Sequence, residues 1–204
     1  MLKANLYLEQ ADPCSYLPKN TCTPCEDFIT RLEAGKITEK DYPLLTSQQL
    51  HAFKLILHAE AYLPFVPLLT TPQPMPEGLY PINEPDNSSL VIVSGNSRLT
   101  FEVLATIWAQ GITPAYFLLV NCLGNTVDMA MVYGEFTPGR LLQTLKDSHL
   151  EDKVEHHHMI VPGLTMPLVR DFVKVTGWNV EAGPICAAAL PLFLGDQWVF
   201  SDIL

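Results

Sequence analysis

The spacing of hydrophobic and polar positions predicts two helices in the first third of the chain. The first follows Thr23 and Pro24, which suit the cap and first position of a helix, and it ends at Gly35. The second starts at Thr46 or Ser47, and its apolar side chains recur at helical spacing through residue 63. Two short helices bury little apolar surface, so we expect this unit to need a metal, a cluster or a partner surface.

Short apolar runs alternate with helical stretches from residue 88 onwards. The runs are SLVIVSGN, AYFLLVNC, HHHMIVPG and WNVEAGP, and between and after them lie SRLTFEVLATIWAQ, TPGRLLQTLKDS, LTMPLVRDFVKVTG and ICAAALPLFLG. Continuous apolar strands separated by helices are typical of sheets that are covered on both faces. We predict an α/β fold: an open, mostly parallel, Rossmann-like sheet with helices on both faces, preceded by a small helical module.

Seven prolines between residues 64 and 85 separate the two patterns. Each proline restricts its own backbone and that of the residue before it, so this segment is expected to be extended and irregular. We therefore divide the chain into a cysteine-containing helical module at 1–63, a proline-rich linker at 64–87 and an α/β domain at 88–204.

Composition narrows the class of protein. The chain has 204 residues, 48% of them hydrophobic, which excludes intrinsic disorder and is enough for a full domain core. The formal net charge of −10 argues against nucleic acid as a partner, because phosphate binding needs a basic face. Neither an apolar run of ~20 residues nor an apolar leader is present, so we expect no membrane partner and a cytoplasmic location.

Glycine and small polar residues follow four of the predicted strands. In a doubly wound sheet, ligands bind beyond the carboxyl ends of the strands, where small residues let the backbone approach a flat ligand. The candidate cofactor-binding residues are Ser94, Gly95, Asn96, Thr100, Asn121, Cys122, Gly124, Thr126, Pro162, Gly163, Leu164, Gly183, Pro184, Ile185, Cys186 and Ala187. Ordinary turns between strands and helices also need glycine, so each turn taken alone has a structural explanation as well.

Familiar catalytic and nucleotide motifs are absent. The sequence contains no G-x-G-x-x-G, no Walker A motif and no G-x-S-x-G elbow. His156 and His158 share one face of a predicted strand while His157 faces away, so only two ligands converge and we expect a solvated or capping role. We assign no catalytic residue.

The five cysteines fall into two groups. Cys14, Cys22 and Cys25 crowd the N-terminus, and a C-x-x-C pair at the start of a helix is either a redox dithiol or half of a metal site. These three are the candidate metal ligands. Cys122 and Cys186 stand singly in apolar surroundings, which favours packed thiols over a thiolate that binds a metal.

The C-terminal part resembles the large subunit of the corrinoid iron–sulfur protein, a methyl carrier for acetyl-CoA synthase. The similarity covers more than half the chain, through LVIVSGNSRLT, AYFLLVNCLGNTVDMA, EDKVEHHHMIVPGL and GWNVEAGPICAAALPLFL. Its landmarks are Ser94-Gly95-Asn96, Pro162-Gly163 and Gly183-Pro184 at strand ends. The resemblance implies a corrinoid (cobalamin) bound without its lower base on cobalt, held by backbone from the four strand-end loops.

The N-terminal stretch LPKNTCTPCEDFITRLEAGKITEKDYPLL resembles the four-iron cluster module of the same family. The family pattern is C-x2-C-x4-C-x16-C, but Tyr42 stands at the fourth position and four residues are absent between Cys22 and Cys25. This indicates a degenerate module without a complete four-iron–four-sulfur cluster. The TIM barrel that separates the two parts in the family has no room in this chain.

Three functions remain open at this stage. The first is a corrinoid-binding methyl carrier or accessory protein in one-carbon metabolism, non-catalytic by itself and working with a methyltransferase or TIM-barrel partner subunit. The second is a thiol- or iron–sulfur-based electron-transfer or sensor protein, indicated by the clustered cysteines. The third is a scaffold that keeps the fold without the cofactor, because fold and function often separate.

Overall fold

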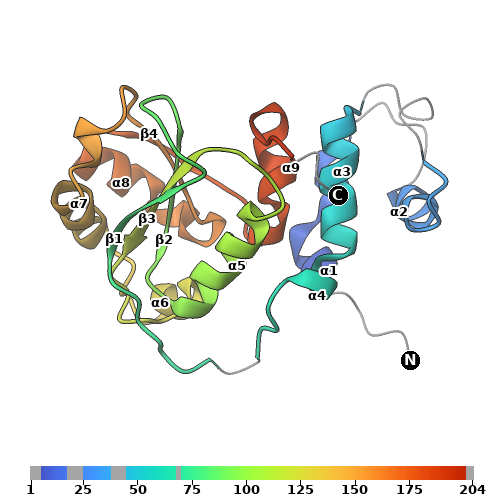
Figure 1. Cartoon of the computed structure of the whole chain (residues 1–204). Helices are drawn as coiled ribbons and strands as arrows, with labels where there is room; N and C mark the ends of the chain where they lie inside the picture. The colour runs from blue at the N-terminus through green and yellow to red at the C-terminus, as the bar shows by residue number, and fades with distance from the viewer. Residues whose placement is uncertain (1–5, 18–24, 38–44, 68–69, 201–204) are drawn as a thin grey trace.

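The computed structural model describes residues 6–17, 25–37, 45–67 and 70–200. Helices α7 and α8 lie on one side of a central sheet, and α5 and α9 lie on the other (Figure 1). The N-terminal helices α1 and α3 form a further layer outside α9 (Figure 1). This arrangement confirms the predicted α/β architecture with helices on both faces.

The sheet has five strands in the order β1-β3-β2-β4-β5. The strands are β1 Gly78–Ile82, β2 Leu90–Gly95, β3 Ala115–Val120, β4 His158–Val161 and β5 Asn179–Ala182. Neighbouring strands are parallel except β1, which pairs antiparallel with β3 at one edge. The chain moves from β2 outward to β3, then returns to β4 on the other side of β2. The strand order therefore reverses between β2 and β4.

The described helices include every predicted helical stretch, but α1, η1, α6 and η2 are additional, and the second predicted helix is divided into α3 and α4. Those before the sheet are α1 Leu6–Ala11, η1 Pro13–Tyr16, α2 Cys25–Glu33, α3 Ser47–Leu57 and α4 Ala59–Tyr62. Those around the sheet are α5 Arg98–Trp108, α6 Val127–Val132, α7 Pro138–Asp147, η2 Leu150–Asp152, η3 Gly163–Leu168, α8 Val169–Thr176, η4 Ala187–Ala189, α9 Leu190–Leu194 and η5 Gly195–Gln197. Thr46 caps α3 through a reciprocal pair of hydrogen bonds with Gln49, and the Thr137 hydroxyl caps α7 at Arg140.

Strand β1 lies inside the segment that we predict as an irregular linker. Pro81 is tolerated there because β1 is an edge strand, where one row of backbone groups needs no partner. Tyr80 also fastens this segment locally, since its hydroxyl donates to the Pro76 carbonyl at 2.8 Å. Part of the proline-rich segment is therefore built into the sheet.

Each face of the sheet has its own hydrophobic core. Val91 and Val93 of β2 pack with α7 and α8, whereas Ile92 packs on the opposite side with Trp108 of α5. The core on the Ile92 side continues without interruption into the N-terminal helices. There the Phe28 and Phe53 rings meet edge to face, with 5.0 Å between their centroids. The N-terminal helices thus gain their buried surface from the α/β part, while the division into domains stays a prediction.

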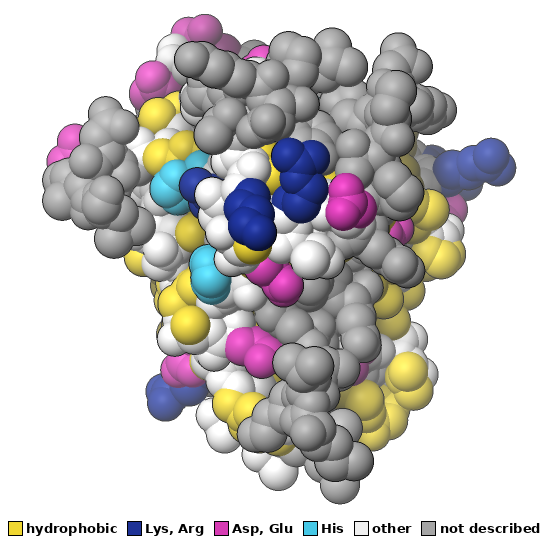
Figure 2. All heavy atoms as spheres, turned by 90° about the vertical axis from the view of Figure 1, so that its right-hand side faces the viewer, with side chains coloured by type: hydrophobic (Ala, Val, Ile, Leu, Met, Phe, Trp, Pro, Cys, Tyr) yellow, Lys and Arg dark blue, Asp and Glu magenta, His cyan; other side chains and the backbone are white. Residues whose placement is uncertain are grey.

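The N-terminal helices also present a face to solvent, seen in Figure 2. Among the coloured side chains there, Lys and Arg lie close to Asp and Glu, so the charges of this described surface are mixed rather than of one sign.

Candidate functional site

A cavity of about 500 Å³ lies at the carboxyl ends of β2 and β4. Ser94 of β2 and Val161 of β4 both line it, and these strands are in register at Ile92 and Ile160. The cavity therefore occupies the point at which the strand order reverses. Open α/β sheets bind ligands at this place, because the connections from the two strands lead away in opposite directions and leave a crevice.

The cavity wall is mainly apolar with a few polar groups. Its apolar side chains come from both sides of the crevice, among them Leu99 and Val103 of α5, Val127 of α6 and Leu164 of η3. The hydroxyls of Ser94, Thr100 and Thr126, the carboxylate of Asp128 and the amide of Gln10 provide polar groups. An apolar surface with a small number of converging polar groups is the usual composition of a site for a small molecule or cofactor.

The Thr126 hydroxyl has no hydrogen-bond partner within the described part of the chain. Its oxygen is buried and has no hydrogen-bond partner, although Thr126 occupies the cap position of α6. Buried hydroxyls without a partner are rare because an unmade hydrogen bond costs ~1–3 kcal/mol. The oxygen is shielded from solvent, so a ligand in the cavity reaches it only after the Thr126 side chain rotates.

Nine of the sixteen predicted cofactor-binding residues line this cavity. They are Ser94, Thr100, Thr126, Pro162, Leu164, Gly183, Pro184, Ile185 and Ala187. The other seven do not line it: Gly95, Asn96, Asn121, Cys122, Gly124, Gly163 and Cys186. Eight of the nine lie on β2 or in the segments that follow β2, β4 and β5, and Thr126 lies in the segment after β3, at the cap position of α6.

Asn96 is bound by the protein itself. Its side-chain oxygen accepts from the backbone N–H groups of Cys122 at 2.7 Å and Gly124 at 3.2 Å, and its amide donates to Met75 O at 2.9 Å. The proline-rich segment thus crosses the ends of β2 and β3 and uses the polar groups there. Arg140 similarly donates to the Asn121 carbonyl at 3.1 Å. These groups hold the strand-end loops together, and the assignment of Asn96 and Asn121 as cofactor contacts stays a prediction.

Two of the predicted glycines are required by close backbone contacts. A Cβ on Gly124 would lie 2.3 Å from Pro74 N, and one on Gly163 would lie 2.6 Å from Gly183 O. Gly163 also donates its N–H to Pro184 O at 3.1 Å. Gly163 therefore positions the Gly183–Pro184 wall of the cavity without lining it.

Cys122 and Cys186 are buried free thiols outside the cavity wall. Burial raises the pKa of Cys122 to about 12 and also raises the pKa of Cys186. For Cys122, Glu135 adds to the increase, while Arg140 and the hydrogen bond within the Asn96 network oppose it. Both thiols are consequently protonated at neutral pH, in agreement with packed side chains.

The N-terminal cysteines are only partly described. Cys14 is disulfide-bonded, whereas Cys22 and the side chain of Cys25 lie outside the described residues, as does Tyr42. Within the described ranges, no three His, Cys, Asp or Glu side chains are grouped so that they could hold a metal ion. The assignment of Cys14, Cys22 and Cys25 as metal ligands stays a prediction.

The three consecutive histidines have three different partners. His156 Nε2 lies 2.9 Å from Ser89 O, the His157 ring meets Trp178 edge to face, and His158 Nε2 lies 3.2 Å from Glu181 Oε2. They lie at the start of β4, at the end of the strand opposite to the cavity. The described geometry gives each of them a structural contact.

Gln10, Val66 and Asp128 line the cavity although the sequence pattern does not select them. Gln10 and Val66 precede the first strand, so their sequence neighbours contain no signal for a sheet-edge site. Asp128 belongs to α6, whose six residues are too short for a reliable helical pattern.

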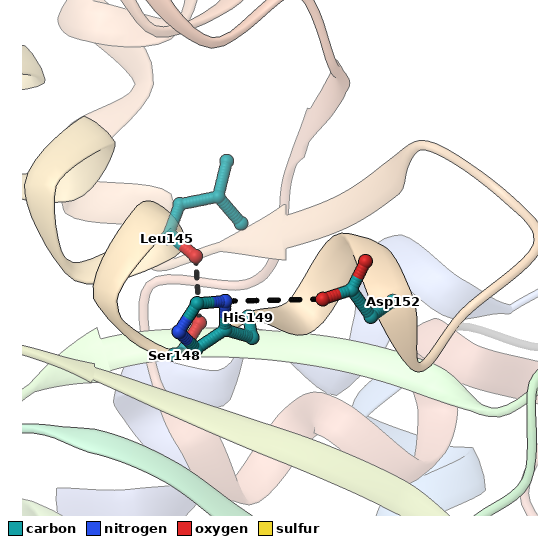
Figure 3. A network of polar contacts seen from close by, with 4 residues as sticks. All are labelled: Leu145, Ser148, His149 and Asp152. Atoms are coloured by element: carbon teal, nitrogen blue, oxygen red, sulfur yellow. Dashed lines mark hydrogen bonds and ion pairs between the residues drawn. The ribbon is translucent and has the colours of Figure 1, made fainter.

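A second hollow of about 500 Å³ lies beside β1 and α7. Glu77, Tyr116, Asp147 and Lys153 are among its lining residues. Figure 3 shows the polar contacts near its Ser148 wall: the Ser148 hydroxyl donates to Leu145 O at 2.8 Å, and His149 Nδ1 lies 3.8 Å from Asp152 Oδ2. The first contact ends α7 and the second is exposed to solvent, so neither has a visible role in binding.

Among the described residues, no helix combines the length and apolar character needed to cross a bilayer.

The family model and the individual relatives that match this chain point to related proteins. Residues 43–194 match the family model of the CO dehydrogenase/acetyl-CoA synthase delta subunit. The chain is 32% identical over 126 residues to the acetyl-CoA decarbonylase/synthase complex subunit gamma of Methanopyrus kandleri, covering 62% of this chain and 27% of that protein. With the same subunit of Methanocaldococcus jannaschii it shares 26% over 196 residues, covering 90% of this chain and 39% of that protein.

A third relative is the corrinoid/iron-sulfur protein large subunit of Moorella thermoacetica. It is 29% identical over 153 residues, which is 70% of this chain and 34% of that protein. The chain therefore spans between about a quarter and two fifths of the length of these relatives.

Proposed function

The chain belongs to the CO dehydrogenase/acetyl-CoA synthase delta subunit family, and from this premise we propose that it binds a corrinoid in the cavity between β2 and β4. In this role the chain is a methyl carrier or accessory protein of one-carbon metabolism. Residues 88–204 then correspond to the C-terminal corrinoid domain of the large subunit, preceded by a degenerate cluster module.

The place and composition of the cavity carry this proposal, because it lies where the strand order reverses and its mainly apolar wall includes the hydroxyl-bearing residues Ser94, Thr100 and Thr126. A corrin ring is a broad apolar plate whose edge carries amide side chains. Ile92, Ile160 and their apolar neighbours suit the plate, whereas the hydroxyls of Ser94, Thr100 and Thr126 suit the amides. The backbone at Gly183 and Pro184 lies at the same wall and has no bulky side chain to hold a flat ligand away.

The chain's own residues bind and orient the group. A bound corrinoid supplies the cobalt that accepts and donates a methyl group. The described residues that line the cavity include no histidine, so this wall offers no imidazole to cobalt. That composition suits a corrinoid held with its lower base off. Asp128 lines the same cavity and adds a carboxylate to its wall.

Protein partners follow from the same proposal. The relatives from Methanopyrus and Methanocaldococcus are named as subunits of a complex, and we propose a methyltransferase or TIM-barrel subunit as the partner of this chain. Exposed apolar side chains lie on the strand-end segments: Met166 is 64% and Ile185 is 67% exposed. Because Met166 follows β4 and Ile185 itself lines the cavity, a partner seated there would meet the cofactor.

Visible absorption titration with hydroxocobalamin and cobinamide tests the proposal. We expect saturable spectral changes in the wild-type protein, and weaker binding in Thr126→Val. This variant should fold as stably as the wild type, because the Thr126 hydroxyl has no partner to lose. Thr106→Val is the matched control, since its hydroxyl bonds Glu102 O within α5, and it should bind like the wild type. A flat titration of folded wild-type protein with both ligands would reject the proposal.

Cys14 supports a second candidate function. It is disulfide-bonded, as expected if the N-terminal cysteines take part in thiol redox chemistry, whereas a cluster would need the reduced thiolates. Anaerobic preparation followed by iron and sulfide analysis, and differential alkylation before and after reduction, separates these uses. Thiols that are equally alkylated in both states, in a protein free of iron, would exclude both.

A further inference from the structure

The outer wall of the cavity comes from the N-terminal part of the chain. Gln10 of α1 and Val66 of the segment after α4 line it together with Ile185, Ala187 and Leu190. Gln10 and Val66 both precede the first strand of the sheet. The cavity at the sheet edge is thus completed by the helices that the sequence pattern assigns to a separate module.

Tyr7 connects the three segments that make this wall. Its hydroxyl donates to Pro64 O at 2.5 Å, two residues before Val66. Its backbone carbonyl faces the Cys186 thiol at 4.0 Å, one residue after Ile185. Gln10 lies three residues after Tyr7, which is about one turn of α1. One side chain and one carbonyl of Tyr7 therefore set the relative positions of α1, residues 64–66 and the loop after β5.

Packing holds α1 against the rest of the molecule from the other side. Ala11 is 5% exposed in the core shared with Phe53 and Ile56 of α3, and Tyr7 packs against the same core. Gln10, by contrast, is exposed, and its side chain makes no hydrogen bond to any described residue. Its carboxamide offers both a donor and an acceptor to whatever occupies the cavity.

We propose that helix α1 and residues 64–66 form a closing wall of the corrinoid site, with Gln10 as a direct ligand contact and Tyr7 as the residue that positions the wall. This proposal rests on the function proposed above. Gln10 would pair its carboxamide with an amide at the corrin edge, while Val66 and Ile185 cover apolar surface. The N-terminal helices then serve cofactor binding without any cluster.

Paired variants in a cobinamide titration test the proposal. We expect Gln10→Ala to bind about tenfold more weakly than wild type, as the loss of one polar contact to the ligand implies. Gln143→Ala is the matched control, because Gln143 is an exposed glutamine on α7 that bonds only Asp147 among the described residues. It should bind like wild type.

Tyr7→Phe removes the hydroxyl that holds residues 64–66, and we expect faster cobinamide dissociation with a small decrease in melting temperature. Tyr80→Phe is its control, since Tyr80 also donates to a proline carbonyl of the same segment but lies outside the cavity. Hydrogen exchange adds a readout that a merely structural role would not change: residues 6–11 should gain protection when cobinamide binds. If Tyr7→Phe does not fold, Gln10→Ala and hydrogen exchange decide the question.

The outcomes separate the two proposals. Wild-type binding with losses in Gln10→Ala and Tyr7→Phe alone supports the closing wall. Wild-type binding that is equal in all four variants, without added protection of residues 6–11, overturns the wall and leaves corrinoid binding intact. Absence of wild-type binding overturns the proposed function, and the wall with it.

Discussion

The side-chain oxygen of Asn96 accepts a hydrogen bond from the backbone N–H of Cys122 at 2.7 Å. This contact ties the end of β2 to the end of β3, and the second N–H, from Gly124, completes the bridge. The amide of the same side chain reaches Met75 O, so the proline-rich segment is fastened across both strand ends. A residue at a predicted ligand-binding position is thus a structural link.

Asn96→Ala should lower the free energy of unfolding by ~2–4 kcal/mol, because it leaves two buried N–H groups and one carbonyl without their partner. Chemical denaturation measures the change. Gln143→Ala, which removes only an exposed hydrogen bond to Asp147, should change it by less than ~0.5 kcal/mol. Equal effects of the two substitutions would contradict this role of Asn96.

Gly124→Ala should cost clearly more than Gly134→Ala. Both glycines have positive φ, of 79° and 67°, so an added Cβ costs ~1–2 kcal/mol of backbone strain in either. Only at Gly124 would the Cβ also collide with Pro74 N at 2.3 Å, whereas Gly134 has open space. Thermal or chemical unfolding of both variants measures the difference, and a difference near zero would show that residues 73–74 do not lie against this loop.

Gly163→Ala should weaken cobinamide binding about tenfold, because its Cβ would displace Gly183 and Ile185 from the cavity wall. Gly139→Ala introduces the same methyl group where nothing lies within 4 Å, in the first turn of α7, and should leave binding unchanged. Titration of both variants provides the measurement. Unaltered affinity in Gly163→Ala would place the ligand away from the loops after β4 and β5.

Cys122 should react slowly with a disulfide reagent at pH 8 in the folded protein and quickly in denaturant, because burial raises its pKa to about 12. The same shift in pKa also makes the free energy of unfolding depend on pH. In the unfolded chain this thiol ionises near its ordinary pKa of 9, so between pH 9 and 12 the unfolded state has lost a proton that the folded state keeps.

Stability should therefore fall as pH rises through that window, and less steeply in Cys122→Ala than in wild type. Denaturation at several alkaline pH values in both proteins isolates the contribution of this thiol from those of the tyrosines and lysines. Parallel pH profiles would show that the folded thiol titrates normally.

Much of the fold follows from local sequence patterns. Val91, Ile92 and Val93 form a continuous apolar run because β2 is buried on both faces, and the same reasoning identifies β3. Thr137 and Pro138 mark the start of α7 because cap chemistry is local. Strand β1 has no such signal, since Pro81 opposes a strand everywhere except at an edge.

The sequence predicts cavity-lining residues only where these residues belong to the ends of the strands. Ser94, Pro162 and Gly183 line the cavity because the carboxyl ends of parallel strands share one edge of the sheet. Asn96 and Gly124 stand at the same kind of position yet bind the segment around Pro74 instead. Whether a strand-end glycine lines the cavity, as Gly183 does, or lies against another backbone segment, as Gly124 does, depends on contacts more than twenty residues away in the chain.

Local sequence patterns were enough to predict the α/β pattern, the helix caps and the edge of the sheet at which we propose the ligand site, because these depend on hydrophobic period and short-range hydrogen bonds. Tertiary structure alone decided that β2 and β4 border the cavity, that Thr126 keeps an unpartnered hydroxyl, and that Gln10 and Val66 close the wall. These features depend on long-range packing, including that of the N-terminal helices against one face of the sheet. The hydrophobic period within a single segment does not show which distant segment packs against it.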